Sequence, residues 1–171
     1  MRILLFFIWI IFSQLAIGAD NYLDMILTPE GLGPIKIGLK PEQISGLLNT
    51  DITKAKHQYT ENDCSSFALG DNPIFGGNIR FLINKGTLGE ISVYTDKIKT
   101  DKGLTVKRTM ADAEKLYEGL IKRGVTHYGE IELTIEYPEL STKMKMVGSE
   151  EYIRYIAIGR KPEIDFTEGC L

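Results

Sequence analysis

Apolar and polar residues alternate with a period of two over residues 79–83, where Ile79, Phe81 and Ile83 fall on one face. The turn residues Asn84-Lys85-Gly86 follow, and then a β-rich stretch at 88–94. Alternation of this kind is typical of a strand with one buried face, and asparagine and glycine favour a tight turn between strands. The pattern predicts an antiparallel hairpin.

The second half of the chain repeats this alternation. It occurs in three stretches separated by turn residues, at 133–137, 143–146 and 152–158. Pairing Ile135 opposite Met144 puts Glu136 opposite Lys143 on the solvent-facing side, which is a favourable cross-strand pair. We therefore expect this register in a second set of antiparallel strands.

Two short segments have the helical period instead, and they lie at a constant offset of 69 residues. Both present apolar side chains at helical spacing: Ile44, Leu47 and Leu48 in the first, and Ala113, Leu116 and Tyr117 in the second. Pro41 suits the first turn of one helix, and Thr109 with Asp112 resembles an N-cap at the start of the other. We expect both apolar triplets to lie in the core.

Each half of the chain thus consists of a short helix followed by about three strands. The predicted fold class is α+β, with two tandem repeats, each a short helix packed on an antiparallel sheet, at residues 20–97 and 98–171. A unit of about 70 residues buries little core alone, so we expect the two units to share a sheet or an interface.

Residues 1–19 have the layout of a secretory signal peptide: Arg2, an apolar run to Phe12, and small residues before Asp20. The run is shorter than the roughly 20 apolar residues that span a bilayer. We expect cleavage near Ala19 and a periplasmic or secreted protein without a transmembrane segment. No cysteine lies directly after the apolar run, where a lipid would be attached, which argues against a lipid anchor.

The whole chain has a formal net charge of −3 and two cysteines, Cys64 and Cys170. A mildly acidic protein has no field suited to a nucleic-acid backbone. In an oxidising compartment an isolated cysteine pair favours a disulfide, which we expect between Cys64 and Cys170. The alternative, a metal or redox pair, lacks a CxxC motif and a histidine at zinc spacing.

The stretch from Gly31 to Leu39, the second-half motif Gly103–Val106 with Thr109 and Tyr117, and the terminal Glu168–Cys170 resemble a set of secreted bacterial proteins of unassigned function. The tandem unit is similar to the β-lactamase inhibitor protein architecture and, in single copy, to lipoproteins of the SmpA/OmlA type. This resemblance implies a fold and a binding habit but no catalytic residue. The chain departs from the pattern at Lys107 and Arg108, where glycine and a small residue are expected.

Motifs of known chemistries are missing from the sequence. His57 and His127 are the two histidines, and neither belongs to an HExxH motif. Gly33 to Gly38 lacks the lysine and hydroxyl residue of a phosphate loop, and no GxSxG motif is present. We therefore expect no metal and no cofactor.

Three tyrosines are candidates for a binding surface: Tyr94, Tyr152 and Tyr155. Tyr152 and Tyr155 fall on opposite faces of one predicted strand, so one of them should face away from the core. Exposed aromatic side chains on a sheet suit protein recognition. We expect a non-enzymatic binding protein, inhibitor-like or an envelope accessory factor, whose partner is another envelope or extracellular protein. The alternative is an envelope hydrolase with its site between the repeats.

Overall fold

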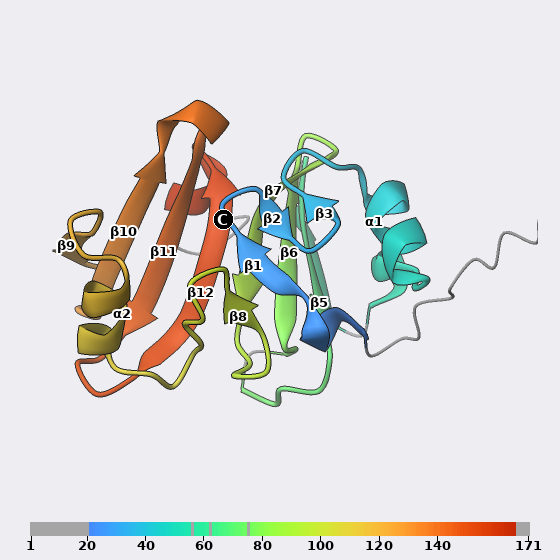
Figure 1. Ribbon diagram of the computed structural model, residues 1–171. Coiled ribbons are helices and arrows are strands. Elements are labelled where there is room, and N and C mark those ends of the chain that lie inside the picture. Colours follow the sequence, from blue (N-terminus) through green and yellow to red (C-terminus); the bar gives the residue numbers. More distant parts are fainter. Residues whose placement is uncertain (1–20, 56, 62, 75, 167–171) are drawn as a thin grey trace, which may run out of the picture.

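The computed structural model describes residues 21–55, 57–61, 63–74 and 76–166, with the backbone alone for Asn21 and for residues 57–60. An eight-stranded antiparallel sheet forms one layer (Figure 1). A second layer, made of two helices and a four-stranded sheet, covers one face of it. Within the described residues, no α-helix covers the other face of the large sheet.

The large sheet consists of two four-stranded meanders joined along β7 and β12, in the order β4-β5-β6-β7-β12-β11-β10-β9. Its strands are β4 (His57–Glu61), β5 (Cys64–Leu69), β6 (Ile79–Asn84), β7 (Thr87–Val93), β9 (Lys122–Val125), β10 (Ile131–Tyr137), β11 (Thr142–Gly148) and β12 (Ile153–Arg160). At the junction Ile91 lies opposite Ile158. The predicted pairing of Ile135 with Met144 and of Glu136 with Lys143 is confirmed.

The small sheet has the order β3-β2-β1-β8 and lies in front of the central strands of the large sheet (Figure 1). Its strands are β1 (Ile26–Thr28), β2 (Gly31–Leu32), β3 (Ile35–Lys36) and β8 (Lys99–Thr100). Strand β8 pairs in parallel with β1, although more than 70 residues separate them in the sequence. The small sheet therefore ties the start of the described chain to its second half.

The helices α1 (Pro41–Leu48) and α2 (Met110–Leu116) begin 69 residues apart, at the predicted offset. Short 3-10 turns complete the chain: η1 (Asn21–Asp24), η2 (Ile52–Lys54), η3 (Pro138–Leu140) and η4 (Glu163–Asp165). The last of these contacts β7 and β12 on the side of the sheet away from the helices. It is the one 3-10 turn that borders the site described below.

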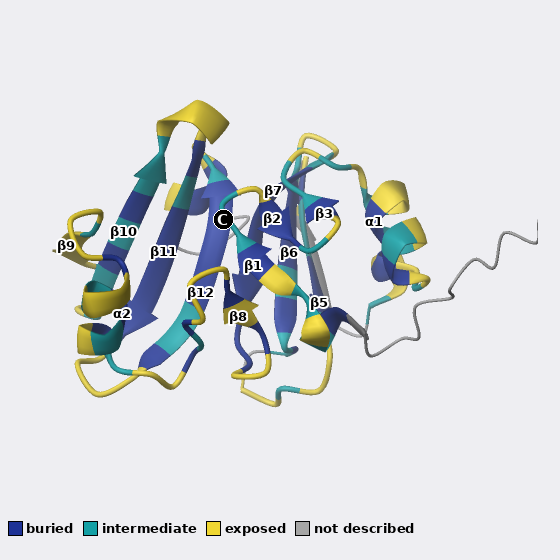
Figure 2. Cartoon of the chain, in the orientation of Figure 1, coloured by how far each residue is buried: buried dark blue, intermediate teal, exposed yellow. Residues whose placement is uncertain are grey.

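A single hydrophobic core lies between the two layers, and the central strands that border it are largely buried (Figure 2). Alternating residues of β5, β6, β7, β10, β11 and β12 contribute to it, as do both helices and strands β1 to β3 of the small sheet. Ile44 and Leu48 of α1, and Ala113 with Tyr117 at the end of α2, are buried in it, as expected. Leu47 is partly buried against the same core.

The predicted fold class was wrong about the repeating unit. The chain does not form two separate repeats of a helix with about three strands. Each helix precedes four strands of the large sheet, and β7 pairs with β12, so the eight strands form one sheet with a second small sheet beside it. Sequence alternation found β6, β7, β10, β11 and β12 but missed β4, β5 and β9. It also missed the two- and three-residue strands, which have too few positions for a period.

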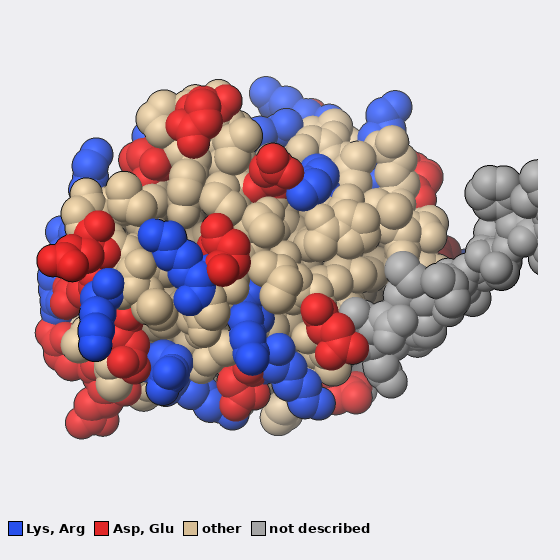
Figure 3. Space-filling model, viewed as in Figure 1, with Lys and Arg blue, Asp and Glu red and all other residues tan. Residues whose placement is uncertain are grey.

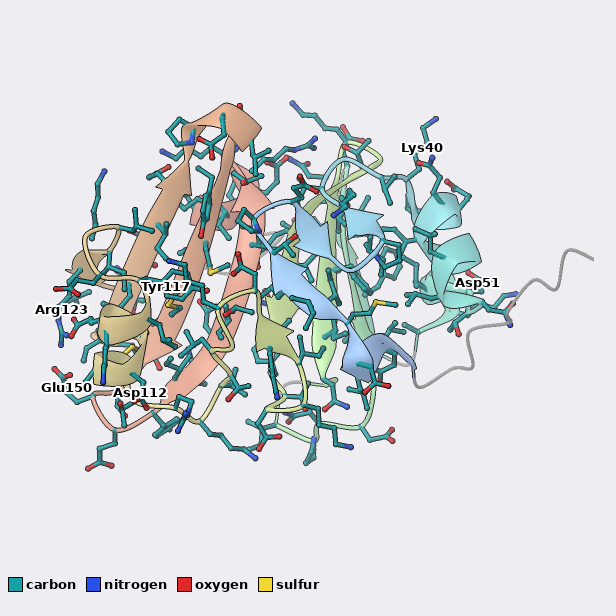
Figure 4. The ribbon with its side chains drawn as sticks, viewed as in Figure 1. Lys40, Asp51, Asp112, Tyr117, Arg123 and Glu150 are labelled. Carbon is teal, nitrogen blue, oxygen red and sulfur yellow. The ribbon has the colours of Figure 1, made fainter. Side chains whose placement is uncertain are left out.

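Leu116 was also predicted wrongly. It is 40% exposed, whereas its neighbour Tyr117 is completely buried (Figure 4). The helix ends at Leu116, and Tyr117 has left helical geometry at the C-cap. An extrapolated helical period therefore fails at this last turn.

Two further predictions fall at least partly outside the described residues. The leader at 1–19 lies outside them, and so does Cys170. Cys64 is the one cysteine in the described part of the chain, where it is buried at the start of β5. The predicted disulfide between Cys64 and Cys170 therefore falls outside the described residues.

Candidate functional site

A cavity of about 390 Å³ lies on the face of the large sheet that carries no helix. Strands of both meanders contribute side chains to it: Arg80 from β6, Lys145 from β11, and Arg154 with Tyr155 from β12. Tyr94, directly after β7, completes its floor. The turn between β9 and β10 and the residues around η4 form its rim.

Strand alternation places most of these side chains. Arg80 lies between Ile79 and Phe81, which are completely buried in the core, so the arginine points to the opposite face. Lys145 lies in the same way between two buried methionines. The polar positions of the alternating strands thus converge on the second face of the sheet.

A β-bulge places the last two of these side chains, Arg154 and Tyr155. The register between β11 and β12 shifts at Val147 and Gly148, so that Tyr155 lies opposite Val147 and Ile153 lies opposite Gly148. Arg154 is the extra residue between them. A bulge re-aims side chains locally, and here the consecutive residues Arg154 and Tyr155 both line the cavity.

Two tyrosine rings form the floor, each with an arginine over it. The ring centroids of Tyr94 and Tyr155 are 5.5 Å apart with a 39° tilt. The Arg80 guanidinium lies 5.6 Å from the Tyr94 centroid, and that of Arg154 lies 5.5 Å from the Tyr155 centroid. Such cation–π contacts contribute about 0.5–2 kcal/mol each and hold the planar groups in place.

Desolvation raises the pKa of the Tyr94 phenol and of the Tyr155 phenol. In both cases burial is the largest cause, and the nearby arginine charges oppose it only in part. Both side chains are therefore neutral phenols at physiological pH. They offer an aromatic surface with a hydroxyl rather than a phenolate base.

Two of the three cations in the cavity are neutralised by carboxylates of the same site. Lys145 Nζ lies 3.2 Å from Glu132 Oε2 and donates to the Ile164 carbonyl at 2.7 Å. Arg154 forms an ion pair with Glu130. The carboxylates of Glu130 and Glu132 are thus held by cations of the same cavity.

Glu90 lies on the same sheet face as Arg80 but does not line the cavity. Its carboxylate accepts a hydrogen bond from Ser92 Oγ and is 9% exposed. Desolvation raises the pKa of Glu90, while the Ser92 hydrogen bond and the charges of Arg80 and Lys145 act in the opposite direction. The group is buried beside the site rather than presented to it.

The rim carries a second aromatic pair, His127 and Tyr128, with ring centroids 5.5 Å apart and edge-to-face geometry. Both lie in the turn from β9 to β10. The Thr126 N–H donates to the Glu130 carbonyl at 2.8 Å, and Gly129 has the positive φ of 80° that the turn requires. Tyr128 is 60% exposed and accessible at the edge of the cavity.

The structure brings together two of the three predicted tyrosines. Tyr94 and Tyr155 are adjacent on the cavity floor, whereas Tyr152 is 48% exposed before β12 and does not line the cavity. Sequence reasoning missed Arg80, Arg154 and His127. Alternation alone could have found Arg80, but the bulge at Arg154 and the fold of the His127 turn leave no such signal.

The face of the molecule that carries the helices has a different distribution of charged side chains. Lysines and arginines alternate with acidic side chains there, and neither sign gathers into a large patch (Figure 3). On this face Arg123 lies beside Glu150 and pairs with it and with Glu114 (Figure 4). Within the described residues, no group of three or more histidine, cysteine or acidic side chains is placed to hold a metal ion.

Comparisons with known proteins identify a fold but no family. The chain is similar in structure to an uncharacterised Escherichia coli protein, yfeY, with a TM-score of 0.50 and 13% sequence identity over 80% of this chain and 99% of that one. No protein-family model and no curated protein matches the sequence. In the described part of the chain, no helix has the length and apolar character needed to cross a membrane.

Proposed function

We propose that this chain is a non-enzymatic binding protein of the bacterial envelope or its surroundings, and that it engages another protein through the cavity-bearing face of its large sheet. The observation that supports this best is the Tyr94–Tyr155 pair with its two stacked arginines. Tyrosine and arginine dominate binding hot spots because each buries much surface at low entropic cost.

The rigidity of the site also favours binding. Tyr155 and Arg80 lie within strands of one sheet, and Tyr94 directly follows a strand whose residues are paired on both sides. Side chains on paired strands lose less freedom on association than side chains on mobile loops. The interface would therefore be largely pre-formed.

The alternative is a hydrolase with its site between the two halves of the chain. The cavity does lie across strands of both meanders, which is where such a site would be. Against this, Glu130 and Glu132 are paired with Arg154 and Lys145. Among the described residues that line the cavity there is no serine or cysteine. A binding site requires no nucleophile and no free carboxylate, so binding explains the residues of this cavity better than hydrolysis does.

The test starts from a partner captured by a photo-crosslinking amino acid at position 155 in the living cell. The affinity of the purified partner is then measured for wild type, for Tyr155→Ala and for Tyr152→Ala as the matched control. We expect Tyr155→Ala to weaken binding at least tenfold, about 1.4 kcal/mol or more, and Tyr152→Ala to change it less than twofold.

Equal affinity for wild type and Tyr155→Ala, with both proteins folded by circular dichroism, would reject the sheet-face interface. Turnover of an ester or cell-wall substrate that is lost with Glu132→Gln would favour the hydrolase instead.

A further inference from the structure

Arg80 differs from the other cations of the cavity in its charge environment. Lys145 and Arg154 have carboxylate partners within the site. Among the described residues, no carboxylate lies within 4.0 Å of the Arg80 guanidinium; the contact described for that group is the face of the Tyr94 ring. The cavity therefore contains one cation that is stacked but not neutralised.

The nearest acidic positions do not supply that charge. Glu90 lies on the same sheet face and interacts electrostatically with Arg80 over a longer distance, but it forms no ion pair with Arg80 and lies outside the described cavity lining. Asp165 lines the cavity but pairs with Lys143. An anion from outside is thus the missing partner of Arg80.

The guanidinium geometry favours a carboxylate for this role. Its planar fork of N–H donors matches the two oxygens of a carboxylate, and a bidentate pair is stronger than a neutral hydrogen bond. The contact with the Tyr94 ring restrains the guanidinium in advance, so less side-chain freedom is lost when the pair forms. A cavity of about 390 Å³ also leaves space for the residues on either side of that carboxylate.

We infer that the cavity receives an acidic segment of a partner polypeptide, with an aspartate or glutamate side chain paired to Arg80 and its neighbouring residues packed on Tyr94 and Tyr155. This inference rests on the proposed function and adds the chemistry of the partner. Charge complementarity selects the acidic side chain, and the tyrosine pair beside it selects an apolar or aromatic neighbour.

The probes are two matched peptides, acetyl-Gly-Tyr-Glu-Tyr-Gly-amide and the same peptide with Gln in place of Glu. A third peptide, the Gln peptide with a free C-terminal carboxylate, distinguishes a chain terminus from a side chain. Binding is followed by amide NMR shifts in the mature wild-type chain, in Arg80→Gln, and in Arg123→Gln as the control. Arg123 is an arginine on the opposite face of the sheet, paired with Glu114 and Glu150.

We expect the Glu peptide to bind wild type and Arg123→Gln at least fivefold more tightly than the Gln peptide, with shifts at the cavity residues. The preference should disappear in Arg80→Gln and be reduced in Arg80→Lys, which keeps the charge but loses the fork. The lysine variant also serves if the glutamine variant does not fold.

Equal binding of the Glu and Gln peptides to wild type, or no cavity shifts with millimolar Glu peptide, overturns the inference. So does a free C-terminus that binds as tightly as the Glu side chain. These failures leave the proposed function standing, because that function fails only when Tyr155→Ala leaves the affinity of the captured partner unchanged.

Discussion

Glu90 is the most unusual single residue of the fold, because its carboxyl group is buried on a strand and faces away from the apolar core. The turn η4 contacts β7, and the Glu90 side chain is buried. Desolvation raises the pKa of Glu90 against the hydrogen bond from Ser92. In the unfolded chain the group is solvated and keeps its ordinary pKa.

This difference predicts a pH dependence of stability. Because the pKa is higher in the folded state, the folded protein binds more protons, and stability is lost as pH rises through the folded value. Glu90→Gln cannot ionise and keeps an oxygen that accepts from Ser92. We expect wild type to lose stability relative to Glu90→Gln as pH rises from the ordinary glutamate pKa of about 4.3 toward neutral, measured by urea unfolding. A difference that is constant across this range would contradict the prediction.

Tyr117 and Leu116 are neighbours with opposite environments. The Tyr117 ring is fully buried, and its hydroxyl donates to Thr100 Oγ1 at 2.8 Å. The same Thr100 oxygen accepts from the Leu104 N–H at 3.0 Å. The Tyr117 ring thus fills the core under α2, and its hydroxyl bonds to Thr100 of β8.

We expect Tyr117→Ala to lower the free energy of unfolding by about 3–5 kcal/mol, because it leaves a large cavity in the core. Tyr117→Phe removes only the hydrogen bond and should cost about 1 kcal/mol. Leu116→Ala, at an exposed position, should stay within about 0.5 kcal/mol. Chemical denaturation of the three variants checks the order, and a costly Leu116→Ala would contradict it.

At the scale of elements, the two helices start differently. α2 has a capping box, in which Thr109 Oγ1 accepts from the Asp112 N–H at 3.0 Å and Asp112 Oδ2 accepts from the Thr109 N–H at 3.2 Å. α1 begins after Lys40, whose N–H donates to Gln43 Oε1 at 2.9 Å (Figure 4). A lysine side chain has no acceptor, so only half of the box is present in α1.

Lys40→Ser should complete that box. Lys40 already has extended backbone geometry with φ −82° and ψ 155°. A serine hydroxyl would add an acceptor for the Gln43 N–H, which donates to the Lys40 carbonyl at 3.0 Å. The substitution also removes a positive charge from the positive end of the helix dipole. We expect a gain of about 0.5–1 kcal/mol in urea unfolding. Thr109→Ala is the reverse experiment on α2 and should cost about 1 kcal/mol. No gain for Lys40→Ser would count against the capping argument.

At the scale of the whole molecule, two contacts join the halves of the chain into one cooperative structure. Strand β7 pairs with β12 in the middle of the large sheet, and β8 pairs with β1 in the small one. Each half alone would leave a long sheet edge and one apolar sheet face uncovered, a combination that is unstable in water.

The isolated segments 20–97 and 98–171 should therefore not fold, whereas residues 20–171 should unfold in one transition. Narrow amide dispersion in NMR spectra of each segment, and coincident circular dichroism and calorimetric transitions of the whole chain, would agree with this. A well-dispersed spectrum from either segment would instead show an independent repeat.

The sequence alone determined the local features of this protein. The alternation of Ile135 and Met144 with polar neighbours specified both the strand and its register, because a shift by one residue would turn every apolar side chain to solvent. The offset of 69 residues placed both helices. The departure at Lys107 was also informative: this residue adopts φ 66°, the left-handed geometry for which glycine is favoured.

Tertiary structure decided how these elements combine. No local pattern specifies that β7 pairs with β12, because both are buried apolar strands that could each have formed an edge of a separate sheet. The cavity depends on that pairing, since it brings Tyr94 beside Tyr155, and on a bulge that turns Arg154 toward the same side. Periodicity reports which face a residue occupies within its own strand, whereas a binding site requires several strands to meet, and only the folded chain brings them together.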